Sequence, residues 1–440
     1  MKTKFISTLL LGLSAMASSF AGAPVPAVQL RVDPERTSIH PDSQNRCVVQ
    51  IELEGKSATS KRALPLNISL VLDRSGSMQG AKLERARQAA CLAIDRLGDN
   101  DTFSLVTYDD SVNVLIPPQR VRDRDALKSL VRQIECGGST ALYAGVQRGA
   151  EQVRKFLDAE NVTRVILLSD GIANVGPSKT EDLSRLGKTL RKEGISVTTV
   201  GLGDDYNEDL MTALAEASHA NYYYVRDAEK LPDVFARELG EVQSVIARNV
   251  ILRVTLPEGV RAKGVLGEPE LAFRGQRLEV SLSDFVGSQT RRFLIECEPG
   301  SLPDGPAPVA TAELVFNDIE TGQEQRQSAT AEVRRAANQA EADSSLNVAV
   351  GREVAIQENR LAKEKAVALA DNGRLREAAG VMAGQAAINR ALPASVSSPK
   401  LESEAKDLDR GAAKLSSGVW ESSDRKQIQY DNYRDKNQKN

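Results

Sequence analysis

The chain has 440 residues, 41% of them apolar, which is enough for roughly two to four domains with buried cores. Its 57 basic and 60 acidic side chains nearly cancel to a net charge of −3, so the chain offers no basic field for nucleic acid. Aromatic residues make up only 4% of the chain, and this argues against platforms on which nucleic-acid bases stack.

The N-terminus is typical of a secretory signal peptide. Two lysines precede an apolar run over 5–13, and small residues follow it. Cleavage after Ala21 is favoured over cleavage two residues later, because the later cut would place a proline directly after it. We therefore expect residues 1–21 to be removed and the mature chain to be exported to the periplasm or secreted. No later apolar run reaches the ~18 residues that a membrane span needs, so we expect no transmembrane segment after cleavage.

Two flanking regions show the alternation of β-strands. Residues 27–62 read as a strand pair, and residues 248–335 read as several short strands separated by turns rich in glycine and proline. Two strands alone are marginally stable, so we expect both flanks to build one β-sandwich. The sandwich would then contain an inserted domain over 63–247.

Strands and helices alternate through this inserted region. Such alternation predicts an α/β fold, Rossmann-like and doubly wound, with a mostly parallel sheet covered on both faces. The strands are expected at 67–72, 102–108, 112–116, 164–169, 196–200 and 222–225, and the helices at 82–97, 123–134, 142–157, 181–192, 208–217 and from 232.

The region 336–440 is expected to be helical, with a polar tail. Helical patterns over 346–370 and 375–392 flank an Asp-Asn-Gly turn signal, which predicts a helical hairpin. A serine-rich linker follows at 393–399. The last twenty residues are polar with mixed charges, and we expect them to be loosely ordered.

Three loops carry small oxygen-bearing side chains at the ends of predicted elements. A buried strand ends in Asp73, which begins a D-x-S-x-S motif with Ser75 and Ser77. A Gly-Gly-Ser-Thr loop ends in Thr140, and a second buried strand leads into Asp170. In the common strand order 3-2-1-4-5-6 the first and fourth strands are neighbours, so these loops meet at the carboxyl edge of the sheet. Hydroxyl and carboxylate oxygens suit a hard divalent cation.

The three motifs resemble the von Willebrand factor type A domain and its metal-ion-dependent adhesion site over about 180 residues, as found in exported bacterial proteins of this type. The resemblance implies that Ser75, Ser77 and Thr140 give hydroxyl ligands to Mg²⁺, or to Mn²⁺ or Ca²⁺. It implies that Asp73 and Asp170 hold coordinated waters or bind the cation directly. A protein partner would supply an acidic side chain as the last ligand, because a cation among neutral hydroxyls keeps net positive charge.

Other chemistry has little support in the sequence. The chain has two histidines, His40 and His219, and neither is placed by sequence near Ser75 for a nucleophilic pair. No G-x-S-x-G elbow and no zinc spacing is present. We therefore expect no catalytic residues and no enzymatic activity. Arg74 occupies a variable position of the motif and is expected to be a solvated surface charge.

Four cysteines in an oxidising compartment allow three disulfide pairings. Cys47 and Cys297 fall on apolar faces of predicted sandwich strands, which favours a bridge between them. Cys91 lies in the first predicted helix of the inserted domain and Cys136 lies just before the Thr140 loop, so these two form a second candidate pair. The alternative is that all four are buried small apolar residues.

Two functions follow from these patterns. The first is divalent-metal-dependent protein–protein binding, for adhesion or assembly, in the cell envelope or outside the cell. The second is a regulatory or chaperone-like subunit of an envelope complex that binds through its helical C-terminal region. Binding that is lost on chelation favours the first, and binding that survives chelation favours the second.

Overall fold

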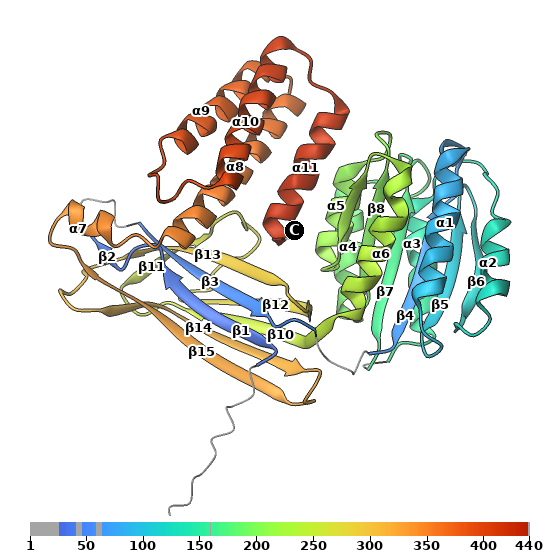
Figure 1. The fold of residues 1–440 in the computed structure, drawn as a ribbon, viewed down its shortest axis with the longest axis horizontal. Coiled ribbons are helices and arrows are strands. Elements are labelled where there is room, and N and C mark those ends of the chain that lie inside the picture. The colour runs from blue at the N-terminus through green and yellow to red at the C-terminus, as the bar shows by residue number, and fades with distance from the viewer. Residues whose placement is uncertain (1–25, 41–45, 59–63, 159, 439–440) are drawn as a thin grey trace, which may run out of the picture.

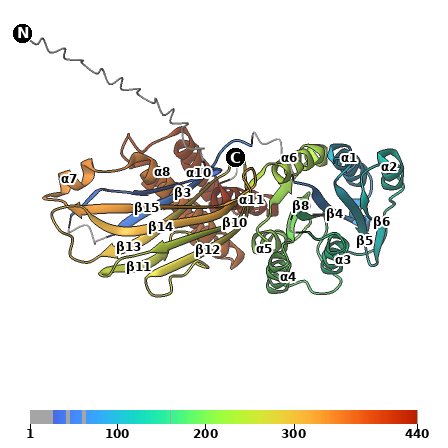
Figure 2. The same cartoon turned by 90° about the horizontal axis from the view of Figure 1, so that it is seen from below.

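The computed structural model describes residues 26–40, 46–58, 64–158 and 160–438, which form a β-sandwich, an α/β domain and a helical region (Figure 1). The sandwich and the α/β domain lie side by side along the long axis of the molecule (Figure 2). The α/β domain interrupts the chain of the sandwich, so the predicted fold class is confirmed. The predicted signal peptide at 1–21 lies outside the described residues.

The sandwich combines strands from both flanks of the α/β domain. One sheet has the order β1-β3-β13-β11 and the other has the order β12-β10-β14-β15-β2. The strands of the first sheet are β1 (Val28–Pro34), β3 (Cys47–Gly55), β13 (Thr290–Pro299) and β11 (Val260–Val265). Those of the second are β12 (Arg277–Val286), β10 (Val245–Thr255), β14 (Ala307–Asp318), β15 (Glu324–Arg335) and β2 (Ser38–Ile39).

Strand β3 joins the early flank to the late one. It lies between β1 and β13, and its Val49, Ile51 and Leu53 side chains are fully buried in the sandwich core. The alternation over residues 27–62 predicted strands in this part of the chain. Strand β11 lies in the late flank, where several short strands were predicted, and its register is broken next to Gly264.

All four cysteines are free thiols in the structure. Cys47 and Cys297 are buried and directly opposite each other on β3 and β13. Contact of the two thiols, together with burial, raises the pKa of Cys47 far above its ordinary value. Cys91 and Cys136 are half-buried against the core of the α/β domain. The Cys47–Cys297 bridge therefore stays a prediction, with its two partners placed side by side.

The α/β domain is built on one six-stranded sheet with the order β6-β5-β4-β7-β8-β9. This is the order 3-2-1-4-5-6, and only the edge strand β6 runs antiparallel to its neighbour. The strands are β4 (Leu66–Asp73), β5 (Thr102–Tyr108), β6 (Val112–Arg120), β7 (Val162–Ser169), β8 (Ser196–Leu202) and β9 (Tyr222–Val225).

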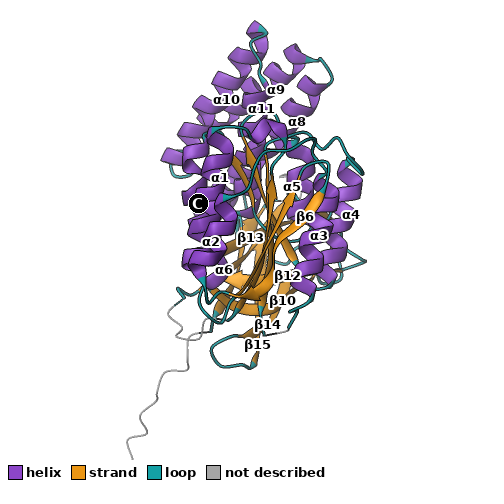
Figure 3. Cartoon of the chain, turned by 90° about the vertical axis from the view of Figure 1, so that its right-hand side faces the viewer, coloured by secondary structure: helices purple, strands orange, loops and turns teal. Residues whose placement is uncertain are grey.

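Helices cover both faces of this sheet (Figure 3). On one face α1 (Ala81–Arg96), α2 (Arg124–Arg132) and α6 (Leu231–Gln243) pack over Ile68 and Leu70 of β4. On the other face α3 (Leu142–Arg154), α4 (Thr180–Lys192) and α5 (Glu208–Ala217) pack over Val71. Every residue of the central strand β4 is buried, and five of its eight residues are apolar, as expected for a parallel strand covered on both faces.

The helical region begins after β15. It contains α7 (Gln339–Ser344), α8 (Val348–Asp371), α9 (Leu375–Arg390), α10 (Pro399–Ser417) and α11 (Ser422–Asn437). Helices α8 and α9 form the predicted hairpin, and α10 packs against α9 around small apolar side chains and Met382. Among the described helices, none combines the length and the apolar content that crossing a bilayer requires.

The expectation of loose order over the last twenty residues is wrong for α11. This helix packs against α8 of the helical region and also lies against α5 and β9 of the α/β domain (Figure 1). The rings of Tyr430 and Tyr433 meet the ring of Tyr222 edge-on, with centroids 5.9 and 5.6 Å apart. Lys426 is buried and forms an ion pair with Glu208. Helix α11 is polar on average, but the side that carries its tyrosines packs against β9, a strand about 200 residues earlier in the chain.

Candidate metal centre

The strand order brings both motif carboxylates to one edge of the sheet. Asp73 is the last residue of β4, and Asp170 directly follows β7. Because β4 and β7 are parallel and hydrogen-bonded neighbours, their carboxyl ends lie together. Both side chains are fully buried. Thr140 reaches the same edge from the loop before α3.

Three hydroxyl groups converge beside these carboxylates. Ser75 Oγ lies 3.1 Å from Ser77 Oγ, and the Ser77 hydroxyl donates to Asp170 Oδ1 at 2.7 Å. A Cβ atom at Gly171 would lie 2.9 Å from Thr140 Oγ1, 3.3 Å from Ser77 Oγ and 3.8 Å from Ser75 Oγ. The three hydroxyls therefore surround one point, and glycine keeps that point free. The structure brings all five predicted site residues together.

Asp73 organises the motif from inside the fold. Its Oδ1 accepts a hydrogen bond from the Ser75 backbone N–H at 2.9 Å, and its Oδ2 accepts one from the Ser169 hydroxyl at 2.7 Å. Burial raises the pKa of Asp73, and the charge of Asp170 adds to this, although the hydrogen bonds partly offset it. Because Asp73 and Asp170 are both buried at the ends of neighbouring strands, a positive charge beside them is favourable.

A lysine that sequence reasoning missed supplies such a charge. Lys82, in the first turn of α1, places its Nζ 2.6 Å from Asp170 Oδ2. Its own side chain is 28% exposed, so it reaches the buried carboxylate from the surface. The sequence signal for this pairing was the position of Lys82 at the start of the helix that follows the D-x-S-x-S motif, because that helix begins beside the motif loop.

Arg74 is not the solvated surface charge that was expected. It forms an ion pair with the carboxylate of Asp109, at 2.6 Å, and that carboxylate is almost fully buried. Arg74 O also accepts a hydrogen bond from the Gly137 N–H at 2.6 Å. A side chain at Gly137 would collide with Asp109. The residue after Asp73 therefore ties the first motif loop to the glycine-rich loop and to the end of β5.

The donor set fits a hard divalent cation. Within the ranges that the structure describes, no group of three or more His, Cys, Asp or Glu residues could hold a metal. The centre differs from such a group because three of its five side chains are neutral hydroxyls. Oxygen donors of this kind suit Mg²⁺, Mn²⁺ or Ca²⁺, whereas zinc sites in proteins are built mainly from nitrogen and sulfur.

A parallel sheet with this strand order and this group of hydroxyls and carboxylates at its carboxyl edge defines a class of α/β binding domain. Residues 67–237 match the family model of the von Willebrand factor type A domain. This part of the chain is a von Willebrand factor type A (VWA) domain, here inserted in a β-sandwich.

Solved structures share the fold over most of the chain. A von Willebrand factor type A protein from Catenulispora acidiphila superposes with a TM-score of 0.67 at 18% identity, covering 88% of this chain and 96% of that chain. The ArnB paralog VWA2 from Sulfolobus acidocaldarius superposes with a TM-score of 0.59 at 18% identity, covering 91% and 98%. At this identity the likeness shows the fold alone.

Similarity in sequence extends to other proteins with shorter overlaps. An uncharacterized protein of Synechocystis sp. is 27% identical over 292 residues, which is 64% of this chain and 68% of that protein. The chain spans 37% of the length of the Escherichia coli protein YfbK and 21% of the length of human inter-alpha-trypsin inhibitor heavy chain H2.

Proposed function

We propose that this protein binds a partner protein through a divalent cation held at the carboxyl edge of its VWA domain, and that it is not an enzyme. The observation that carries the proposal is the convergence of three hydroxyls beside two fully buried carboxylates. Mg²⁺ is the proposed cation, with Mn²⁺ and Ca²⁺ as substitutes. The ligands are Asp73, Ser75, Ser77, Thr140 and Asp170, bound directly or through water.

An acidic side chain of the partner completes the site in this proposal. Ser77 is exposed whereas both carboxylates are buried, so the open side of the centre faces solvent. When bound there, the cation would keep net positive charge among neutral hydroxyls and would attract an outside carboxylate. Lys82 and Arg74, which lie beside the centre, are already paired with Asp170 and Asp109 and are not free to bind a carboxylate of the partner.

Apolar side chains beside the centre support a protein partner. Ile172 is 63% exposed and Val175 is 38% exposed, and both follow Asp170 within five residues. Exposed large apolar residues that gather around a polar site are typical of protein interaction surfaces. We propose that the partner packs an apolar side chain against Ile172 next to its acidic residue.

Binding through the helical region is the second candidate, and the structure favours it less. The apolar side chains of α8, α9 and α10 are already packed against one another, including Ala366, Met382, Leu408 and Leu415. These side chains are therefore not available to a partner, although Ile388 of α9 is 52% exposed. Export to the periplasm or out of the cell is proposed from the N-terminal sequence pattern.

The deciding experiment measures partner capture from envelope extract with Mg²⁺ and with EDTA, using wild-type protein and Thr140→Ala. Capture that requires Mg²⁺ and the Thr140 hydroxyl supports the proposal. Equal capture in EDTA and by Thr140→Ala contradicts it and favours the helical region. A point variant is cleaner than a truncation after Arg335, because the truncation would remove α11 and uncover Tyr222.

A further inference from the structure

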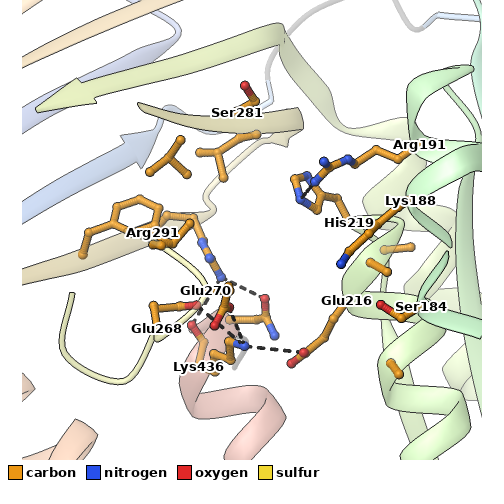
Figure 4. Close-up of a pocket in the computed structure, with 18 of the residues that line it drawn as sticks. Ser184, Lys188, Arg191, Glu216, His219, Glu268, Glu270, Ser281, Arg291 and Lys436 are labelled. Carbon is orange, nitrogen blue, oxygen red and sulfur yellow. Dashed lines mark hydrogen bonds and ion pairs between the residues drawn. The ribbon is translucent and has the colours of Figure 1, made fainter. Parts of the chain in front are cut away.

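A second candidate site lies in a cleft between the VWA domain, the sandwich and the end of α11 (Figure 4). Its volume is about 1020 Å³. Helices α4 and α5 form one wall, and β12 and β13 form the other. The crossover helices run antiparallel to the strands, so the C-terminal ends of α4 and α5 lie at the amino edge of the sheet. The lining extends along α4 from Thr180, and its basic residues Lys188 and Arg191 lie toward the edge opposite the metal centre.

Three basic side chains of this cleft form no ion pair with a carboxylate among the described residues. Lys188 and Arg191 lie one turn apart on α4, and Arg291 faces them from β13. Among the residues that the structure places, no carboxylate comes within ion-pair distance of any of these three. Arg291 Nη1 donates instead to Asn437 Oδ1 at 2.9 Å, and Arg291 Nε is buried without a hydrogen-bond partner.

Several acidic side chains of the cleft are paired with other basic groups. Lys436 lies 3.0 Å from Glu270, 3.4 Å from Glu216 and 3.6 Å from Glu268. Asp284 lies 3.5 Å from Arg248. The acidic group around Lys436 lies on the side of the cleft from which Arg291 projects, and the charge of Arg291 also acts on Glu268, whereas Lys188 and Arg191 lie across the cleft.

His219 lies between the basic groups in an unusual backbone conformation. It follows Ser218, the C-cap of α5, with φ of 56°, at a position where helices favour glycine. Arg191 Nη1 donates to His219 Nε2, so the proton of the neutral ring is on Nδ1. Burial, Arg191 and Arg291 together lower the pKa of His219 to about 4. Two guanidinium groups from different domains thus act on one neutral imidazole.

We propose that this cleft binds a small molecule carrying an oxyanion, with the oxyanion held between Arg191 and Arg291 and assisted by Lys188. Guanidinium groups match the geometry of carboxylate and phosphate, and their mutual repulsion is relieved when an anion lies between them. The cleft is at the upper end of the ~300–1,000 Å³ typical of ligand sites, so the ligand is larger than a bare oxyanion. The binding is independent of the metal centre.

The test uses full-length mature protein in EDTA, with inorganic phosphate and citrate as probes in calorimetric titrations. We expect at least one probe to bind, and Arg191→Gln and Arg291→Gln each to weaken it by about tenfold or more. Binding of phosphate alone identifies a phosphate ligand, and binding of citrate alone identifies a carboxylate ligand. Arg185→Gln is the matched control, because Arg185 also lines the cleft but is exposed and paired with Asp182 at 3.4 Å.

His219→Gly provides a variant that should fold well, since glycine is favoured after a helix. It removes the acceptor that orients Arg191, so the bound probe should be weakened while thermal stability is kept. The proposal is overturned if neither probe binds, if Arg185→Gln weakens binding as much as Arg191→Gln, or if the Arg191, Arg291 and His219 variants all bind like wild type.

Discussion

Lys82 Nζ lies 2.6 Å from Asp170 Oδ2, and the other oxygen of the same carboxylate accepts the Ser77 hydroxyl at 2.7 Å. A fully buried carboxylate at the metal centre is therefore neutralised by a side chain of α1. The ammonium stands next to the place where the hydroxyls converge. Lys82 and a divalent cation would consequently act on the same carboxylate and repel each other.

Replacing Lys82 by methionine should tighten binding of Mg²⁺ or Mn²⁺ by about tenfold, because the competing charge is removed. The same change should lower stability in EDTA, since Asp170 is left buried beside Asp73 without a cation. Calorimetric titration and thermal melts with and without metal measure both effects. Lys128→Met, which removes a surface partner of Asp95, is the control. Unchanged or weaker metal binding in Lys82→Met would contradict this competition.

Asp73→Asn should weaken divalent-cation binding by at least about tenfold while leaving the fold intact. The amide keeps the size of the carboxylate but removes its charge, and it can still accept one of the two hydrogen bonds from Ser75 N–H and Ser169. Asp110→Asn, an exposed carboxylate near the glycine-rich loop, should have little effect. Calorimetry that finds equal affinities for Asp73→Asn and wild type would remove Asp73 from the site.

Thr140→Ala should weaken metal and partner binding more than it changes stability. The loop is held by backbone contacts that survive the change, including the Thr140 N–H that donates to Asn174 Oδ1 at 2.9 Å. We expect the free energy of unfolding to fall by no more than about 1 kcal/mol. Thr140→Ser should restore binding, because it returns the hydroxyl. A serine variant that behaves like alanine would show that the hydroxyl is not the active group.

The acidic cluster near α11 should make stability depend on pH. Burial raises the pKa of Glu268 from its ordinary 4.5 to about 7, despite the opposing charges of Arg291 and Lys436. The stabilisation that comes from keeping Glu268 uncharged in the folded state is fully present below pH 4.5, and it is lost as the pH rises through about 7. Melts from pH 5 to 8 should therefore show a loss of stability that Glu268→Gln reduces.

His219 has the opposite sign and must be separated from Glu268. Its pKa is lowered to about 4, so its contribution is present above pH 6.5 and is lost as the pH falls toward 4. His219 is present in both proteins, so its contribution cancels when the stability of Glu268→Gln is compared with that of the wild type at each pH. A difference that does not change between pH 5 and 8 would contradict the assignment to Glu268.

Exported protein should contain a Cys47–Cys297 disulfide. The two residues are directly opposite on β3 and β13, about 250 residues apart in sequence. Closing so long a loop would stabilise the fold by roughly 4–5 kcal/mol in the chain-entropy model. Peptide mapping without reductant measures the pairing, and finding both thiols free in exported protein would refute it.

Much of the fold could be predicted because its signals are local. The apolar run at 67–72 and its counterpart at 164–169 are periodic and end in carboxylates, so their type and order followed from the pattern. The general rule for open parallel sheets then placed Asp73 and Asp170 at one edge. This placement of the two carboxylates depends on strand order and not on the orientation of any side chain.

The unpredicted features depend on contacts between distant segments. The pairing of Lys82 with Asp170 depends on how α1 is rotated where it begins, and the pairing of Arg74 with Asp109 depends on the end of a neighbouring strand. Helix α11 is polar on average, and its tyrosines gain a buried side only where Tyr222 meets them. The composition of a segment is an average, so it does not show that the aromatic residues of α11 lie on one side of the helix.

The return of α11 to the VWA domain also has a mechanical consequence. Helix α6 ends at Gln243 and β10 begins at Val245, so one end of the inserted domain passes into the sandwich through a single residue. The tyrosine contact of α11 adds an attachment on β9. A pulling force on a partner bound at the carboxyl edge would therefore be shared between the short connection from α6 to β10 and the tyrosine contact of α11. The VWA domain would not rotate freely relative to the sandwich until that contact breaks.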